Sequence, residues 1–225
     1  MAIEDRTKLL LGENYNKLKN YKISIVGLGG VGSIIPLVLS RTGFKKLIVV
    51  DKDTVDSSNL NRQIAYDFSD LGKKKVDIIY QKVKKIDENC EILSISSQIN
   101  KDFDFSIFND SNYIIDAIDD LDAKVLLIKY ALEHNIRIIS SLGMGNKIDS
   151  TKVEITKLNK TTEDPLAKKL RYMLKKEGVD ISKINVCFSK EKPIIKNHII
   201  ASIATVPNSA GLAFVSKIID DILME

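Results

Sequence analysis

The stretch Ile23-Ser-Ile-Val-Gly-Leu-Gly-Gly-Val-Gly-Ser33 decides the fold class of this chain. An apolar run of the kind that forms a buried strand leads directly into closely spaced glycines. Gly27 permits a tight turn, Gly29 lets the backbone approach a pyrophosphate, and Gly32 lets a helix pack closely on the strand. Amide groups at the start of that helix would hold the anion. The pattern predicts a nucleotide-binding fold and leaves NAD, FAD, S-adenosylmethionine and ATP open.

An acidic residue follows the glycines at the spacing that this fold requires. The fingerprint places it about 20 residues further on, at the end of the second strand, where it binds a ribose hydroxyl. Here the apolar run Ile48-Val49-Val50 ends in Asp51. We therefore expect Asp51 to bind the ribose of the nucleotide.

Apolar runs and amphipathic segments alternate along the first part of the chain. Short apolar runs predict strands, and apolar residues three and four apart predict helices. The expected strands are 22–26, 45–50, 91–97, 113–118 and 137–140, and the expected helices are 8–21, 31–41, 73–86 and 123–134. This alternation predicts an α/β fold, a Rossmann-like parallel sheet with helices on both faces.

The pattern weakens after residue 150, where it predicts a strand at 153–156 and helices at 165–176 and 210–224. A chain of 225 residues is long enough for one sizeable core. We therefore expect a single domain over 1–225, with the nucleotide-binding core in 1–150 and a smaller extension of the same domain in 151–225.

Composition narrows the class of protein. The 34 basic and 30 acidic side chains are too evenly balanced to indicate a nucleic-acid-binding protein by themselves, and no DNA partner is expected. Cys90 and Cys187 lie far apart without a Cys-x-x-Cys motif, which excludes a disulfide framework and a four-thiolate zinc site. The first residues lack the apolar block of a signal peptide, and the apolar stretch 199–215 is interrupted by Pro207, Asn208 and Gly211. We expect a cytoplasmic protein without an integral membrane segment.

Polar residues gather in the loop that follows the second strand. Asn59, Asn61, Arg62 and Gln63 lie there, at the strand end where open sheets bind ligands. A dehydrogenase has no need of such a cluster beside its nicotinamide ring. A site that splits ATP between its first two phosphates does need it, because guanidinium, ammonium and a divalent metal must converge on the leaving pyrophosphate.

Arg62, Lys75 and Asp119 are the candidates for that convergence. Each also has an ordinary interpretation. Arg62 could form a loop salt bridge, Lys75 is one of three adjacent lysines, and Asp119 could cap a helix. Their joint occurrence after the glycine turn favours the functional interpretation.

At these residues the chain resembles the ubiquitin-activating-enzyme-like adenylyltransferases, the superfamily of ThiF, MoeB and HesA. The shared pattern is Gly-x-Gly-Gly-x-Gly from Gly27, then Asp51, Asn-x-x-Arg-Gln from Asn59, Gly-x-x-Lys from Gly72, and Asp119 after the fourth strand. The resemblance implies that Asp51 holds the ribose, that Asn59, Arg62 and Lys75 hold phosphates, and that Asp119 binds the magnesium of MgATP. The implied ATP-binding set is Gly27, Gly29, Gly30, Gly32, Asp51, Asp53, Asn59, Arg62, Lys75 and Asp119.

The resemblance also implies a homodimer. In this superfamily an arginine near the N-terminus reaches into the partner subunit's active site, and Arg6 lies where that arginine would be. The implied catalytic residues are therefore Arg62, Lys75, Asp119 and, across the dimer, Arg6. Residues 151–225 would then form the substrate side and the dimer side of the domain.

Within the superfamily the chain is most similar to the tRNA threonylcarbamoyladenosine dehydratases, over 41–43, 148–151, 160–171 and 186–193, apart from Ser150, where that group more often has proline. This implies that the carboxylate of threonylcarbamoyladenosine in tRNA is adenylated, with release of pyrophosphate. The carbamoyl nitrogen then closes a ring and expels AMP. Juxtaposition of the two groups supplies much of the rate, and no enzyme nucleophile is required. Cys187, between Val186 and Phe188, is therefore expected to be a small buried hydrophobic residue.

The helix expected at 165–176 is the candidate for contacts with tRNA. Helical spacing places Lys168, Arg171 and Lys175 on one face, with Lys169 beside them and Tyr172 exposed. A simple solvated face explains the charges equally well. Two other functions stay open: an activator of a ubiquitin-like sulfur-carrier protein, with a sulfur-transfer partner, and an NAD-binding dehydrogenase or redox sensor.

Overall fold

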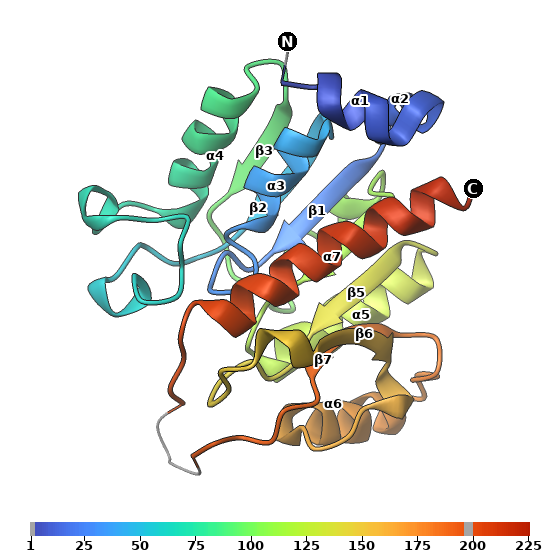
Figure 1. Ribbon diagram of the computed structural model, residues 1–225. Helices are drawn as coiled ribbons and strands as arrows, with labels where there is room; N and C mark the ends of the chain where they lie inside the picture. The colour runs from blue at the N-terminus through green and yellow to red at the C-terminus, as the bar shows by residue number, and fades with distance from the viewer. Residues whose placement is uncertain (1–2, 196–199) are drawn as a thin grey trace.

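The computed structural model describes residues 3–195 and 200–225, so residue 199, where the late apolar stretch begins, lies outside the description. One seven-stranded sheet runs through the protein in the order β3-β2-β1-β4-β5-β7-β6 (Figure 1). All neighbouring strands are parallel except β6, which is antiparallel to β7. The strands are β1 Lys22–Val26, β2 Lys46–Val50, β3 Glu91–Ile95, β4 Tyr113–Asp116, β5 Arg137–Ser141, β6 Val153–Lys157 and β7 Asn185–Ser189.

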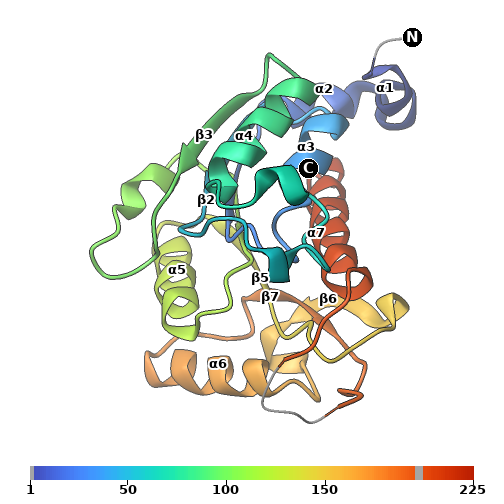
Figure 2. The ribbon, with the colours of Figure 1, turned by 90° about the vertical axis from the view of Figure 1, so that its left-hand side faces the viewer.

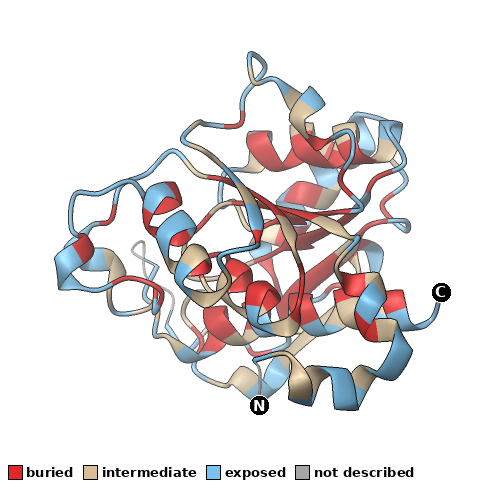
Figure 3. Ribbon diagram, turned by 90° about the horizontal axis from the view of Figure 1, so that it is seen from above, coloured by how far each residue is buried: buried red, intermediate tan, exposed pale blue. Residues whose placement is uncertain are grey.

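Helices cover both faces of the sheet, and each face has its own hydrophobic core. Residues alternate between the two faces along a strand: Ile23 and Ile25 of β1 belong to one core, and Val26 of the same strand belongs to the other. The first face carries α2 Tyr15–Leu18, α3 Ile35–Thr42, α4 Lys75–Ile86 and α7 Thr205–Leu223, with α1 Asp5–Leu11 beside α2, and the second carries α5 Leu121–Glu133 and α6 Pro165–Lys176 (Figures 1 and 2). Figure 3 shows the strands buried between helices whose outer sides are exposed.

The predicted fold class is confirmed. The alternation of strand and helix produces the doubly covered sheet, and strands from 1–150 and from 151–225 lie in that one sheet. The expected parallel sheet differs only at its edge, where β6 runs antiparallel. Among the described residues no helix has both the length and the apolar character to cross a bilayer.

Three local predictions differ from the structure. The helix expected at 8–21 is divided at Gly12, whose φ of 56° ends α1. Helix α3 begins at Ile35 rather than at residue 31, because the residues after the glycines form turns. Helix α7 begins at Thr205, earlier than expected, since Pro207 lies in its first turn, where the missing N–H costs nothing.

Strand β7 was not predicted as a strand at all. Asn185–Ser189 inserts between β5 and β6 and completes the sheet through partners that are distant in sequence. Its apolar centre, Val186 to Phe188, is too short for its sequence alone to indicate a strand, although the structure buries all three residues. The strand conformation of 185–189 therefore depends on its pairing with β5 and β6.

Candidate functional site

The glycine turn lies at the carboxyl end of β1, packed against the end of β4. Gly27 has a φ of 92°, and a Cβ added to it would lie 2.6 Å from the carbonyl oxygen of Ala117. A Cβ on Gly32 would lie 1.8 Å from the carbonyl oxygen of Gly27. Neither position has room for a side chain, so both glycines are required by the backbone packing.

The other two glycines of the turn border the open side of the site. The nearest atom to a Cβ on Gly29 would be Nε2 of Gln63, at 3.9 Å. A Cβ on Gly30 would lie 3.3 Å from Pro207 and 3.4 Å from Cγ of Arg62. The backbone at Gly29 is thus accessible to a ligand, and the residues around it come from the loop after β2 and from α7.

Asp51 ties the loop after β2 to the glycine turn. One carboxylate oxygen accepts the N–H of Leu28 at 2.5 Å, and the other accepts the N–H of Asp53 at 2.7 Å. Burial raises the pKa of Asp51, and these two amide hydrogen bonds oppose the rise. The predicted ribose ligand is therefore held beside the turn at which a nucleotide would bind.

Lys75 turns inward while its neighbours face solvent. Its side chain is 5 % exposed, and its Nζ lies 3.3 Å from the Oδ2 of Asp53. Lys73 and Lys74 are exposed. The interpretation of Lys75 as one more solvated lysine is therefore wrong, because an ammonium group is buried only where it has a charged partner or a ligand.

Arg62 is half-buried in the loop between β2 and α4. Its Nη1 donates to the carbonyl oxygen of Ser58 at 2.8 Å and to the Oδ1 of Asn61 at 2.9 Å. Within 3–195 and 200–225 no carboxylate lies within ion-pair distance of the guanidinium, so the salt-bridge interpretation does not hold. Asn59 lies one turn earlier and accepts the N–H of Asp56 at 3.4 Å. Among the described residues the guanidinium has no acidic partner, which leaves it available to an anion.

Asp119 lies in the exposed loop that leaves β4. A Cβ added to Gly27 would meet the backbone of Ala117 and Ile118, so the loop that carries Asp119 begins against the glycine turn. The interpretation of Asp119 as a helix cap is wrong, because Asp120 caps α5 by accepting the N–H of Ala123 at 2.8 Å. Among the described residues no partner engages the Asp119 carboxylate.

Asp119 offers a magnesium ion one exposed carboxylate that no described residue engages. No cluster of three or more His, Cys, Asp or Glu side chains suited to a metal occurs in the described ranges. Mg²⁺ bound between one carboxylate and the phosphates of a nucleotide needs no such cluster. The exposed carboxylate of Asp119 therefore fits Mg²⁺ that arrives with the phosphates of ATP.

A buried charged group beneath this loop was missed by sequence reasoning. Asp116 and Lys124 are both 0 % exposed, and the Nζ of Lys124 lies 3.0 Å from the Oδ2 of Asp116. The hydroxyl of Ser140 donates to the same oxygen, and the N–H of Ile118 donates to Oδ1 at 3.1 Å. This group fixes the β4–α5 loop to α5 and β5. Its only sequence signal is a carboxylate at the end of an otherwise apolar strand.

Asn208 was also missed, and it fastens the Arg62 loop to α7. Its Nδ2 donates to the carbonyl oxygen of Arg62 at 2.8 Å and to that of Ala204 at 2.7 Å. Its Oδ1 and the Oε1 of Gln63 are buried, and neither has a partner among the described residues. The hydroxyl of Tyr66 donates to the carbonyl oxygen of Leu28 at 3.0 Å. The loop is therefore held against the glycine turn from two sides.

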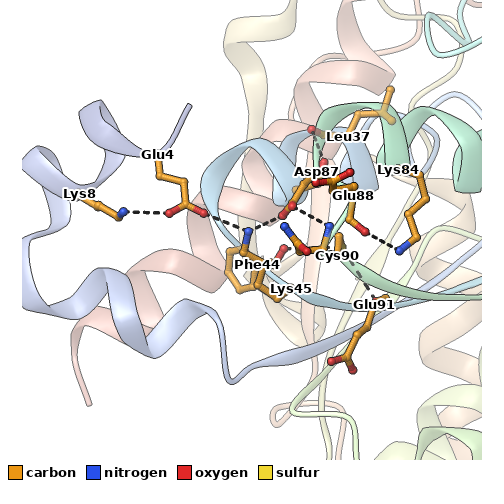
Figure 4. Close-up of polar contacts among 12 residues, drawn as sticks. Glu4, Lys8, Leu37, Phe44, Lys45, Lys84, Asp87, Glu88, Cys90 and Glu91 are labelled. Atoms are coloured by element: carbon orange, nitrogen blue, oxygen red, sulfur yellow. Dashed lines mark hydrogen bonds and ion pairs between the residues drawn. The ribbon is translucent and has the colours of Figure 1, made fainter. Parts of the chain in front are cut away.

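Arg6 is not brought to the other predicted site residues. It is exposed on α1, which precedes β1, whereas the glycine turn lies at the opposite, carboxyl end of β1 (Figure 1). Figure 4 shows how this helix is attached: Glu4 accepts from Lys8 at 2.9 Å and from Lys45 at 3.0 Å, and Lys45 also contacts Asp87. Hydrogen bonds from the two lysines lower the pKa of Glu4 to about 2. The helix that carries Arg6 is therefore anchored to the rest of the subunit, and Arg6 lies away from the glycine turn of that subunit.

The predicted tRNA-binding helix keeps most of its lysines exposed. Lys168, Lys169 and Lys175 face solvent on α6. Arg171 is half-buried instead, and its Nη1 donates to the hydroxyl and to the carbonyl oxygen of Thr161, the latter at 3.1 Å. Arg171 shares a helix face with Lys168 and Lys175, as predicted, but its guanidinium is engaged by Thr161 and is less exposed than the lysines. Tyr172 is exposed, as predicted.

Cys187 is buried in β7, as expected of a small hydrophobic residue. Burial raises the pKa of its thiol to about 12, so the thiolate that nucleophilic chemistry requires is not formed near neutral pH.

Comparisons with known proteins agree with this arrangement. The sequence profile of the ThiF family matches residues 6–222. A tRNA threonylcarbamoyladenosine dehydratase of Bacillus subtilis is 33% identical, over 98% of this chain and 94% of that protein. The solved structure of the Escherichia coli tRNA N6-threonylcarbamoyladenosine dehydratase in complex with ATP superposes with a TM-score of 0.92 at 29% identity, covering 100% of this chain and 98% of that one.

A second kind of relative matches less of the chain. An adenylyltransferase and sulfurtransferase of Vanderwaltozyma polyspora is 30% identical, over 65% of this chain and 33% of that protein. The glycine turn, the loop that presents Lys75 and Arg62, and the match along nearly the whole chain lead to one conclusion. This chain belongs to the ThiF family.

Proposed function

We propose that this protein dehydrates threonylcarbamoyladenosine in tRNA by ATP-dependent adenylation of its carboxylate. The observation that carries the proposal is the inward-facing Lys75, which lies with Asp51 and Asp53 beside a glycine turn that Arg62 and Asp119 flank. Cations and a metal-binding carboxylate around a phosphate-binding turn suit cleavage of ATP at its α-phosphate. The full-length similarity to dehydratases of this name supports the substrate.

The proposed reaction has two steps. The substrate carboxylate attacks the α-phosphorus of ATP, the bond to the pyrophosphate breaks, and an acyl-adenylate forms. The carbamoyl nitrogen then attacks the acyl carbon and loses its proton, and AMP leaves with one former carboxylate oxygen. The tRNA loses one water overall, while ATP becomes AMP and pyrophosphate.

Each site residue has a role in the first step. Asp51 orients the ribose, and the backbone at Gly29 approaches the phosphates. Lys75 and Arg62 neutralise the charge that develops on the leaving pyrophosphate. Asp119 would hold Mg²⁺, which supplies further charge neutralisation when it arrives with ATP.

We propose that the working unit is a homodimer in which Arg6 of each subunit reaches the partner's ATP site. Arg6 lies at the wrong end of β1 to serve its own site. Leu9 and Leu10, on the same short helix, are each 82% exposed, and a partner subunit would cover such an apolar surface. Residues 1–225 of each subunit would act as one adenylation domain.

Mass spectrometry of tRNA tests the function. Incubation with MgATP and tRNA that carries threonylcarbamoyladenosine should remove one water from the nucleoside. Alanine at Arg62, Lys75 or Asp119 should abolish the product, while the matched controls Lys73→Ala and Lys74→Ala, at exposed lysines of the same run, should retain it. Product from all three site variants would refute the site assignment.

A second candidate, an activator of a ubiquitin-like sulfur-carrier protein, rests on the partial match to the sulfurtransferase. It predicts AMP attached to the C-terminus of a small protein in place of a modified tRNA. Adenylation of a carrier protein, with no effect on tRNA, would favour this candidate. An increase in nicotinamide fluorescence on titration with NADH, together with no ATP binding, would favour a dehydrogenase instead.

A further inference from the structure

A hollow of about 560 Å³ lies where α6 packs beside the start of α5. Its walls are almost entirely apolar, although two of the residues around it are lysines. The lining residues are Leu121, Pro165, Lys168, Lys169, Tyr172 and Met173. The two helices that form it can be followed in Figure 2, with α6 directly below α5.

Tyr172 is the central feature of this hollow. Its side chain is 71% exposed, whereas the large aromatic residues of the two cores are fully covered. Helical spacing places Lys168 and Lys169 one turn before it, and both are exposed. An aromatic ring with ammonium groups beside it matches a nucleotide, which has a π-face and a phosphate.

The charges around the hollow favour a polyanion. None of its lining residues is acidic. The carboxylates at the two ends of α6 are engaged elsewhere: Asp164 accepts the N–H groups of Gly143 and Ala167, and Glu177 pairs with Lys129 at 2.8 Å. Glu163 and Asp122 are exposed nearby in sequence, and the four exposed lysines of α6 outnumber them. Lys175 and Lys176 extend the positive charge along the same exposed side.

The hollow also lies close to the expected ATP site. Leu121, which forms part of its wall, is two residues beyond Asp119. Two residues of extended chain span at most about 7 Å, so this wall begins within that distance of the proposed Mg²⁺ ligand. A nucleotide next to the reacting one would therefore reach the hollow.

We propose that this hollow binds an unstacked base of the single-stranded RNA that flanks the modified nucleotide. The base stacks on Tyr172 and lies against Leu121 and Met173, while Lys168 and Lys169 contact its phosphates. Proteins that recognise RNA loops stack splayed bases on aromatic side chains in this way. The inference rests on the proposed function, because the RNA must first be the substrate.

The test is binding of an RNA stem-loop that carries threonylcarbamoyladenosine in its loop and a fluorescent label at one end, followed by fluorescence anisotropy. Tyr172→Ala should weaken binding about five- to 150-fold, the range given by the loss of one base stack. Tyr172→Phe should bind like the wild type, because the ring is kept. Tyr80→Ala removes an exposed tyrosine from α4, away from this hollow, and serves as the matched control.

Salt dependence separates stacking from phosphate contacts. The double variant Lys168→Gln/Lys169→Gln should flatten the slope of log affinity against log salt by about 1.4, since each phosphate contact on single-stranded RNA contributes about 0.7. Tyr172→Ala should leave the slope unchanged. ATP affinity, measured for every variant, shows whether the fold and the nucleotide site are intact.

Each outcome decides between the two proposals. If the wild type and Tyr172→Ala bind the stem-loop equally, the base pocket is refuted and the proposed function stands. If the wild type binds ATP but no RNA, both are refuted. If Tyr172→Ala leaves RNA affinity intact and changes the oligomeric state instead, the hollow is a protein contact and the pocket proposal fails.

Discussion

Replacement of Lys124 by methionine should destabilise the protein strongly, because it leaves a buried carboxylate without its counter-ion. Asp116 is 0 % exposed and would keep only the hydrogen bonds from Ser140 and from the N–H of Ile118. Breaking a buried ion pair by removal of one partner costs about 3–5 kcal/mol. A domain of this size has roughly 5–15 kcal/mol of stability in total, so the loss is a large fraction.

The loss corresponds to a fall in Tm of roughly 6 to 20 °C, at about 2–4 °C for each kcal/mol in a domain of this length. Thermal unfolding followed by circular dichroism measures the fall in Tm, and urea unfolding measures the lost free energy as a lower midpoint concentration. The matched control is Lys129→Met on the same helix, which removes a partly exposed lysine paired with Glu177. A solvent-exposed pair of this kind contributes little to stability, so the control should remain close to the wild type.

A second substitution tests the cause. In the double variant Lys124→Met/Asp116→Asn the buried charge is gone, and the asparagine oxygen can still accept the N–H of Ile118. The double variant should therefore be more stable than Lys124→Met alone. A single variant that loses less than about 1 kcal/mol, or two substitutions whose effects simply add, would refute a charge-paired core beneath the Asp119 loop.

Three further predictions follow from the contacts. Asn208→Ala should weaken ATP binding and lower the free energy of unfolding by about 1–3 kcal/mol, because the carbonyl oxygen of Arg62 loses its buried donor. Isothermal titration with ATP and urea unfolding measure the two effects, and a variant that matched Ser209→Ala in both would contradict the prediction. The pKa of Glu4 is lowered from 4.5 to about 2, so its stabilisation of α1 is complete above pH 4.5 and is lost as the pH falls toward 2. Hydrogen exchange in α1 should rise over that window, and the same profile in Glu4→Gln would rule out this cause. Both thiols should resist alkylation in the folded protein and react once it unfolds, because burial raises the pKa of Cys90 to about 11 and of Cys187 to about 12; rapid labelling with retained structure would argue otherwise.

Local patterns made much of the site predictable. The turn from Gly27 to Gly32 and the position of Asp51 follow from the spacing of glycines and an acid after apolar strands, which depends on neighbouring residues alone. Lys75 was identified through its place in a motif, and only the structure distinguishes its inward-facing ammonium from the exposed Lys73 and Lys74.

Long-range contacts were beyond the reach of such patterns. Asn208 bonds to Arg62 across 146 residues of sequence, and an asparagine in the first turn of a helix reads as an ordinary polar residue. Lys124 lies in an amphipathic helix, where a lysine is expected to face water, and its burial depends on Asp116 and Ser140 of two neighbouring strands. Strand β7 likewise exists through its partners β5 and β6.

The most direct test of the account follows an oxygen atom. The substrate tRNA would carry heavy oxygen in the carboxylate of its threonylcarbamoyladenosine and would be incubated with the protein and MgATP. If the carboxylate attacks the α-phosphorus, mass spectrometry will find one heavy oxygen in the released AMP. Heavy oxygen in inorganic phosphate alongside ADP, or AMP without the label, would contradict adenylation of the substrate.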